Sequence, residues 1–187
     1  MAISELPHQS NFDANSTPEL GRHNIPFGVY LPPRAYTNIE IETWRLKTQK
    51  GESIDSNFLS QRSGVEKRYV ANKDETPFFM GMTAAKDILY PEKKVDVVIV
   101  STSFPQGINF SQTISETLGL SPHLTMDVYA ACSGFTRSLS FLKEKEKEYD
   151  LSGKKILIIT TEKYSPYLHD LRSEGVESDP SLAQTLF

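Results

Sequence analysis

A single cysteine stands where the chain changes from an extended pattern to a helical one. The stretch from Met126 to Phe135 reads MDVYAACSGF, and apolar residues then recur at helical spacing. Cys132 therefore lies at or beside the beginning of a helix, where free backbone N–H groups and the positive end of the helix dipole favour a thiolate. The same N–H groups could hold the oxyanion of an acyl transfer. The position therefore allows nucleophilic chemistry, but by its spacing alone a lone cysteine is more often a small buried hydrophobe.

The other residues that could carry chemistry show no comparable arrangement. The four histidines have no metal-ligand spacing, so we expect no metal site. They are His8, His23, His123 and His169. The sequence lacks a glycine-rich loop that could hold phosphates, and one cysteine excludes an internal disulfide. We interpret the Lys-Glu alternation from Lys143 to Glu148 as the solvated end of a helix.

Composition limits the class of protein. The 187 residues suffice for one domain with a core, and 38% hydrophobic and 24% charged residues are ordinary for a soluble protein. A net charge of -4 gives no attraction to nucleic acid or to anionic membranes. The sequence has no apolar run of about 18 residues, so we expect no membrane span. A lone thiol fits a reducing, cytoplasmic setting.

The chain divides into two unequal parts. Residues 1–22 lack the basic start and apolar centre of a secretory signal, and they are predicted to be a flexible N-terminal extension. Residues 23–187 are predicted to form the folded part.

Within the folded part, apolar β-branched runs alternate with helical patterns. The expected strands cover residues 25–31, 95–100, 124–129 and 155–160. The expected helices follow Thr37, Asp55 and Thr76, cover residues 109–118, and begin again at Ser133. Residues 165–181 are predicted to be a loop. This alternation predicts an α/β fold whose parallel sheet is joined by crossover helices.

The segment DVYAACSGF resembles the nucleophile segment of β-ketoacyl-ACP synthase III, a condensing enzyme of the thiolase superfamily. Other stretches are similar to that family in the same order along the chain. They are YLPPRAYTN, FLSQRSGVEKRYVA, VDVVIVSTSFP, KILIITTE and the final QTLF. The resemblance covers about residues 25–187. It implies the N-terminal half of a thiolase-like α/β fold, with a mostly parallel five-strand-type sheet, helices on both faces, and the last strand and second half missing.

The resemblance also assigns roles to individual residues. Cys132 takes the place of the acyl-accepting cysteine. Phe58 falls where the family commonly has a tryptophan that stacks on the adenine of CoA, and Arg62 matches an arginine that contacts the nucleotide. Phe187 either lines the acyl pocket or belongs to the core.

Four further positions are interpreted from the same alignment of motifs. Gly64 and Arg68 are expected to be structural. Ile108 or Phe110 lies near the segment that reaches across the dimer interface of the family. Residues 179–184 lack the arginine that helps to clamp CoA in the family, which makes a donor other than acetyl-CoA more plausible.

The implied function is an acyltransferase that loads an acyl group on cysteine and condenses it with a malonyl-type thioester, in fatty acid or specialised metabolite biosynthesis. Acyl-CoA or acyl carrier protein would be the substrate, and no separate cofactor is expected. The family's catalytic His and Asn lie in its second half, so we expect a partner that supplies them, an inactive chain without it, and a homodimer or heterodimer. The alternatives are acyl transfer to an oxygen or nitrogen acceptor without condensation, or a non-catalytic or truncated subunit.

Overall fold

The computed structural model of this chain describes residues 25–89, 94–103, 109–175 and 186. The strands are β1 (Arg34–Thr37), β2 (Lys67–Val70), β3 (Val97–Ser101), β4 (Leu124–Val128) and β5 (Ile156–Thr160). The helices are α1 (Asn38–Glu42), α2 (Ser56–Ser63), α3 (Pro77–Leu89), α4 (Phe110–Leu118), α5 (Gly134–Lys145) and α6 (Ser165–Glu174). A short 3-10 helix, η2 (Ala131–Ser133), directly precedes α5.

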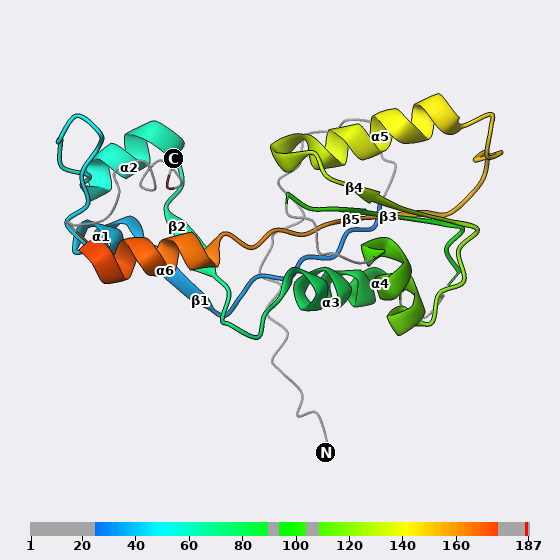
Figure 1. Ribbon diagram of the computed structural model, residues 1–187, viewed down its shortest axis with the longest axis horizontal. Helices are drawn as coiled ribbons and strands as arrows, with labels where there is room; N and C mark the ends of the chain where they lie inside the picture. The colour runs from blue at the N-terminus through cyan, green and yellow to red at the C-terminus, as the bar shows by residue number, and fades with distance from the viewer. Residues whose placement is uncertain (1–24, 90–93, 104–108, 176–185, 187) are drawn as a thin grey trace, which may run out of the picture.

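The centre of the fold is a parallel sheet in the order β4-β3-β5. All five residues of β3 are buried, because the strand lies between two neighbours and between two helical layers. Helices α3 and α4 lie on one face of the sheet and α5 on the other (Figure 1). The expected α/β architecture is therefore confirmed. In the part of the chain that the structure describes, this sheet has three strands.

Side chains of β3 alternate between the two layers, as the pleat of a strand requires. Val98 and Val100 pack in the cluster with α3 and α4. Val97 and Ile99 pack in the cluster that contains residues of α5. Ser101 follows Val97 and Ile99 in this alternation, so its side chain lies on the α5 face of the sheet.

A second lobe is built around an antiparallel pair, β1 and β2. Figure 1 shows α1, α2 and α6 beside this pair, at the opposite end of the molecule from α5. Tyr36, Trp44, Leu59 and Leu168 contribute to its core. The capping box of Thr37 and Glu40 begins α1 at the position that the sequence predicts.

The predicted strand at residues 25–31 is wrong. The segment has no regular secondary structure. Four of its apolar side chains are more than half exposed, namely Ile25, Phe27, Val29 and Leu31. The alternation of apolar residues in the sequence is typical of a strand, but a strand also needs a hydrogen-bonded neighbour, and no described strand pairs with this segment. Gly28 lets the segment pass close to α3, because a Cβ at this position would lie 2.1 Å from the carbonyl oxygen of Ala84.

The predicted loop at residues 165–181 is also wrong for its first part, because residues 165–174 form α6. Pro166 lies in the first turn, where its missing N–H is not needed. Leu168 and Leu171 are buried in the core of the second lobe. Tertiary packing of these two leucines thus overrides the polar composition of the segment. Residues 176–181 lie outside the described part.

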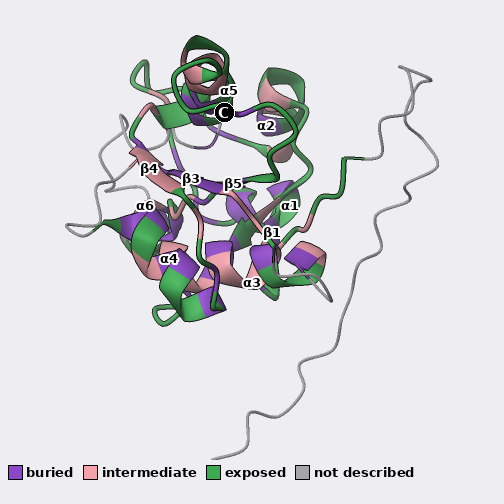
Figure 2. Cartoon of the chain, turned by 90° about the vertical axis from the view of Figure 1, so that its right-hand side faces the viewer, coloured by how far each residue is buried: buried purple, intermediate pink, exposed green. Residues whose placement is uncertain are grey.

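Burial follows the layers of the fold. In Figure 2, β3 is coloured as buried between the helical layers, while the outward faces of the helices are exposed. Within residues 25–89, 94–103 and 109–175, no helix has the length and apolar character that a membrane crossing requires.

Candidate active site: the Cys132 turn

Cys132 lies in the turn that connects β4 to α5. The strand ends at Val128, η2 covers the cysteine, and α5 begins at Gly134. The thiol side chain is exposed and makes no disulfide. The location predicted from the sequence, between a buried strand and a helix, is confirmed.

The turn holds an unusual backbone conformation. Ala131, directly before the cysteine, has φ +45°. This value lies in the left-handed region, which costs a residue other than glycine about 1–2 kcal/mol. Ser133 closes the turn through its N–H and its hydroxyl, which donate to the carbonyl oxygen of Ala130 at 3.0 and 2.6 Å. Backbone strain of this kind is found most often at functional sites.

Gly134 brings the first turn of α5 very close to the central strand. A Cβ on this residue would lie 1.7 Å from the Ser101 Oγ and 3.0 Å from the Ser101 Cβ. Ser101 is completely buried, and its hydroxyl has no hydrogen-bond partner among the described residues. Only glycine fits at position 134 without a shift of α5 or of the Ser101 side chain.

Asp127 fixes the neighbouring helix from the end of β4. Its two carboxylate oxygens accept hydrogen bonds from the backbone N–H groups of Phe110 (2.8 Å) and Ser111 (2.7 Å) at the beginning of α4. Asn109, the residue at the N-cap position, makes no side-chain capping bond. The cap of α4 is therefore supplied across the fold, by a negative charge at the positive end of the helix dipole.

The carboxyl ends of β3 and β5 carry a second polar group. The Ser103 hydroxyl donates to Glu162 Oε1 at 2.9 Å, and the Tyr164 hydroxyl donates to Ser103 Oγ at 3.2 Å. The other carboxylate oxygen of Glu162 is buried without a hydrogen-bond partner in the described structure. These residues and the Cys132 turn share the carboxyl edge of the parallel sheet, where α/β folds commonly bind ligands.

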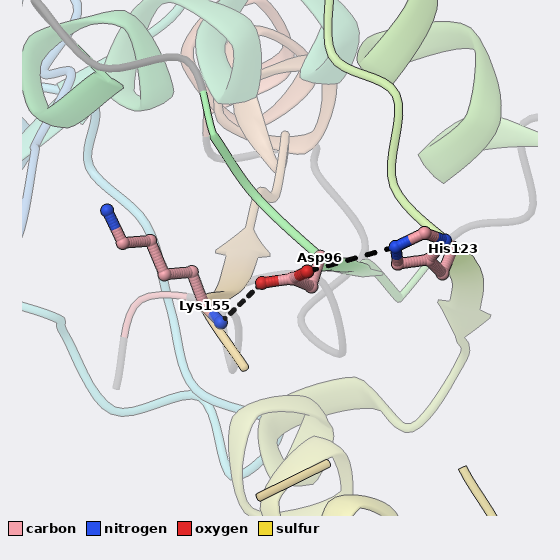
Figure 3. Close-up of polar contacts among 3 residues, drawn as sticks. All are labelled: Asp96, His123 and Lys155. Atoms are coloured by element: carbon pink, nitrogen blue, oxygen red, sulfur yellow. Dashed lines mark hydrogen bonds and ion pairs between the residues drawn. The ribbon is translucent and has the colours of Figure 1, made fainter. Parts of the chain in front are cut away.

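His123 lies at the opposite edge of the sheet. It precedes β4, whereas Cys132 follows it, and five residues of strand separate the two edges by about 16 Å at 3.3 Å per residue. Its Nε2 lies 3.9 Å from Asp96 Oδ1, and Figure 3 shows the two side chains facing each other. Asp96 also accepts a hydrogen bond from the Lys155 backbone N–H at 2.9 Å, and this bond, with nearby positive charges, lowers the pKa of Asp96. This cluster joins the starts of three strands.

Of the remaining histidines, the structure describes one. His169 lies on α6 in the second lobe, and His8 and His23 lie outside the described residues. Over the described ranges, no group of three or more His, Cys, Asp or Glu side chains has the arrangement of a metal site.

Phe58 and Arg62 form a pair on α2. The Arg62 guanidinium lies 5.9 Å from the centre of the Phe58 ring, one helical turn away. Asp55 caps the start of this helix, and Gly64 ends it with φ +65°, which confirms that Gly64 serves a turn. The pair lies on the lobe opposite to the helix that Cys132 precedes (Figure 1).

Arg68 has the structural role that the sequence predicts. Its Nη1 donates to Asn38 Oδ1 at 2.7 Å, and its Nε donates to the Leu186 carbonyl oxygen at 3.1 Å. Burial lowers the pKa of Arg68. The arginine thereby ties Leu186 to the second lobe.

Other predicted positions have different outcomes. Phe110 is buried in the chain's own core, with its ring centre 6.1 Å from that of Phe78. Ile108, Phe187 and residues 179–184 lie outside the described part, so their predicted roles stay predictions.

Sequence reasoning missed Ser101 and Asp127. Both residues end or nearly end a strand beside the Cys132 turn, but their partners are far away in the sequence. The sequence offered only weak signals for Ser101. It is a polar residue at the end of an apolar strand, and its contact, Gly134, stands two positions after the cysteine.

Three known proteins show the similarity of the chain to one family. β-Ketoacyl-[acyl-carrier-protein] synthase III of Aliarcobacter butzleri is 30% identical over 150 residues, which cover 75% of this chain and 42% of that protein. The protein of the same name from Acidiphilium cryptum is 34% identical over 148 residues, covering 76% and 43%. The crystal structure of 3-oxoacyl-[acyl-carrier-protein] synthase III from Aquifex aeolicus superposes with a TM-score of 0.58 at 28% identity, covering 75% and 44%.

No protein-family model matches the chain. The chain spans less than half the length of the two curated relatives, at 42% and 43%.

Proposed function

We infer that this chain, which has the motifs and the thiolase-type fold of the N-terminal half of a β-ketoacyl-ACP synthase III-like enzyme, accepts an acyl group on Cys132. The observation that carries the proposal is the exposed thiol between β4 and α5, at the carboxyl edge of a parallel sheet, inside the segment DVYAACSGF. The activity proposed is that of a condensing acyltransferase in fatty acid or specialised metabolite biosynthesis.

The first half-reaction is a transfer between two sulfurs. The Cys132 thiolate attacks the carbonyl carbon of an acyl thioester and forms a new C–S bond. Backbone N–H groups at the start of α5 would stabilise the resulting oxyanion. Collapse of the tetrahedral intermediate breaks the C–S bond to CoA or to the acyl carrier protein, which leaves as a thiolate and takes up a proton. The acyl group stays on Cys132.

The second half-reaction needs groups that this turn lacks among the described residues. We propose that a second half supplies the His and Asn that assist decarboxylation of a malonyl-type thioester. Loss of carbon dioxide breaks a C–C bond and leaves a carbanion, which attacks the acyl carbon on Cys132 and forms a new C–C bond. The C–S bond to Cys132 then breaks, and the cysteine leaves as a thiolate. The outer face of α5 supports this partner, because Phe135 and Leu139 lie one helical turn apart and are 53% and 46% exposed. A second half packed on α5 would remove these side chains from water.

Intact-mass spectrometry tests the acylation. The chain, co-expressed with a second half, is incubated with a series of acyl-CoA and acyl carrier protein donors. We expect a mass increment equal to one acyl group, absent from a Cys132→Ser control. Because the chain has one cysteine, alkylation with iodoacetamide before the incubation must block the increment. A protein that no donor modifies would refute the proposal.

The pair on α2 bears on the identity of the donor. We propose that Phe58 and Arg62 bind the nucleotide of CoA, since both side chains reach the surface of the same helix. Arg62→Ala should then raise the KM for an acyl-CoA donor by about tenfold, the effect of a lost charge-assisted hydrogen bond. The KM for a carrier-bound donor should not change. An equal rise in the KM for both donors would refute the nucleotide-binding role of Arg62. It would leave the proposed role of Cys132 untouched.

Two alternatives are distinguished by the product. Acyl transfer to an oxygen or nitrogen acceptor consumes the acyl-cysteine without release of carbon dioxide from malonyl thioester. A non-catalytic subunit would show the same turnover after Cys132→Ala in the assembled complex.

The proposed chemistry also needs a free thiol, which fits a reducing compartment such as the cytoplasm.

A further inference from the structure

A buried hydroxyl without a partner lies directly under the start of α5. Ser101 is the last residue of β3 and is 0% exposed, and its Oγ makes no hydrogen bond with any described residue. Burial of an unpaired hydroxyl destabilises a fold, and most buried polar groups are paired. The position of Ser101 beside the Cys132 turn offers an explanation.

The backbone of Ser101 is fixed on both sides. It lies in register with Val128 of β4 and Thr160 of β5, and its carbonyl oxygen accepts a hydrogen bond from the Thr161 N–H at 3.0 Å. The residue therefore cannot move away from the helix above it. A Cβ at Gly134 would lie 1.7 Å from the Ser101 Oγ. Rotation of the hydroxyl would relieve that conflict, but the Ser101 Cβ would still lie 3.0 Å away.

Gly134 is held from the other side as well. Its carbonyl oxygen accepts a hydrogen bond from the Ser138 hydroxyl at 2.8 Å, and Ser138 is fully buried. The N–H of Gly134 donates to the Ala131 carbonyl oxygen, across the cysteine itself. The first turn of α5 and the Cys132 turn are thus one continuous structure that rests on the side chain of Ser101.

Given the proposed role of Cys132, we propose that Ser101 is a positioning residue, whose side chain fixes the height of the first turn of α5 above the sheet through its contact with Gly134 and thereby places the thiol. The hydroxyl is too deeply buried to touch substrate. Its effect on the reaction passes through Gly134, two residues after the cysteine.

Steric compensation follows from this geometry. Gly134→Ala must displace α5 or the Ser101 side chain, because the added methyl overlaps the Ser101 side chain. Ser101→Gly removes both conflicting atoms. Ser101→Ala removes the oxygen but keeps the Cβ that would lie 3.0 Å from the new methyl, so it should relieve the overlap only in part.

The experiment is a double-mutant cycle on the reactivity of the thiol. The second-order rate constant for alkylation by iodoacetamide is measured for the full chain, Gly134→Ala, Ser101→Gly and the double variant, each with a melting curve. The single cysteine makes every modification report on position 132. We expect Gly134→Ala to slow alkylation by about tenfold, because a shift of the start of α5 moves the sulfur relative to the backbone N–H groups of the helix start, which favour a reactive cysteine. The double variant should react at least about threefold faster than the product of the two single effects predicts.

A matched control separates positioning from loss of stability. Gly81 lies on α3, on the other face of the sheet, and a Cβ there would lie 3.0 Å from Ile159 Cγ2. Gly81→Ala should lower Tm and leave the alkylation rate within about twofold of the unchanged chain, as is usual for distant sites. If Gly134→Ala does not fold, the double variant must restore both the cooperative melt and the reactivity.

The outcomes divide cleanly. Coupling in the alkylation rate among folded variants supports the inference. The inference is overturned if Gly134→Ala leaves the alkylation rate unchanged or raises it, or if the two single effects on that rate simply multiply in the double variant. It is also overturned if the double variant does not recover, or if Gly81→Ala slows alkylation as much as Gly134→Ala does. The proposed function would stand in each of these cases. A wild-type thiol that iodoacetamide cannot modify refutes the proposed nucleophile, and the inference with it.

Discussion

The cap that Asp127 supplies to α4 leads to a quantitative prediction. The helix begins at Phe110, and its first two N–H groups donate to the Asp127 carboxylate at 2.8 and 2.7 Å. No side-chain bond from Asn109 replaces them. Replacing Asp127 by alanine leaves both N–H groups without this acceptor and removes a negative charge from the positive end of the helix dipole.

The magnitude follows from the two bonds. A hydrogen bond to a charged group contributes about 1.5–3 kcal/mol. Because Asp127 is half-buried and water can replace part of the loss, we expect Asp127→Ala to lower the free energy of unfolding by about 2–4 kcal/mol. Asp127→Asn keeps one acceptor oxygen and should cost about half as much, roughly 1–2 kcal/mol.

Urea denaturation at neutral pH measures both changes from the shift of the midpoint at constant slope. Asn109→Ala is the matched control, since the exposed Asn109 side chain makes no capping bond, and it should change stability by less than about 0.5 kcal/mol. An Asp127→Ala chain as stable as the Asn109→Ala chain would show that the cap contributes nothing to the fold.

Three further predictions concern other parts of the chain. Burial and the Glu75 carboxylate raise the pKa of Tyr30 to about 12, so its stabilisation is complete below pH 10.0 and is lost as the pH rises to about 12. Tyr30→Phe should therefore flatten the alkaline limb of a Tm–pH curve, and an unchanged limb would contradict this. The lowered pKa of Asp96, due first to the Lys155 N–H, stabilises the fold above pH 3.8 and is lost below it. Asp96→Asn should lower Tm at neutral pH and reduce the further loss on acidification; equal acid sensitivity would argue against it. Leu139→Asp should leave the chain's own Tm nearly unchanged because the side chain is exposed, yet abolish co-purification with a second half; retained co-purification would exclude α5 as the contact.

The sequence alone determined the strands of the central sheet and the starts of two helices in the second lobe. The apolar runs at residues 95–100 and 155–160 are predicted to be buried strands, because a run of this length is too short for a core helix. The structure has β3 and β5 at these places. The caps at Thr37 and Asp55 were readable because a capping residue acts on N–H groups within three positions. The junction at Cys132 followed from the same local signals.

Contacts between distant residues were decided only by the tertiary structure. Residues 25–31 have the alternation of a strand, yet no described strand pairs with them, and α6 forms from a polar segment because two leucines find a core. Asp127 caps a helix that begins 17 residues earlier in the chain. Ser101 meets Gly134 because parallel strands bring their carboxyl ends to one edge. A helix is specified locally, because its hydrogen bonds join residues four positions apart. The pairing of a strand, and the partner of a buried hydroxyl or carboxylate, depend on how distant parts of the chain pack.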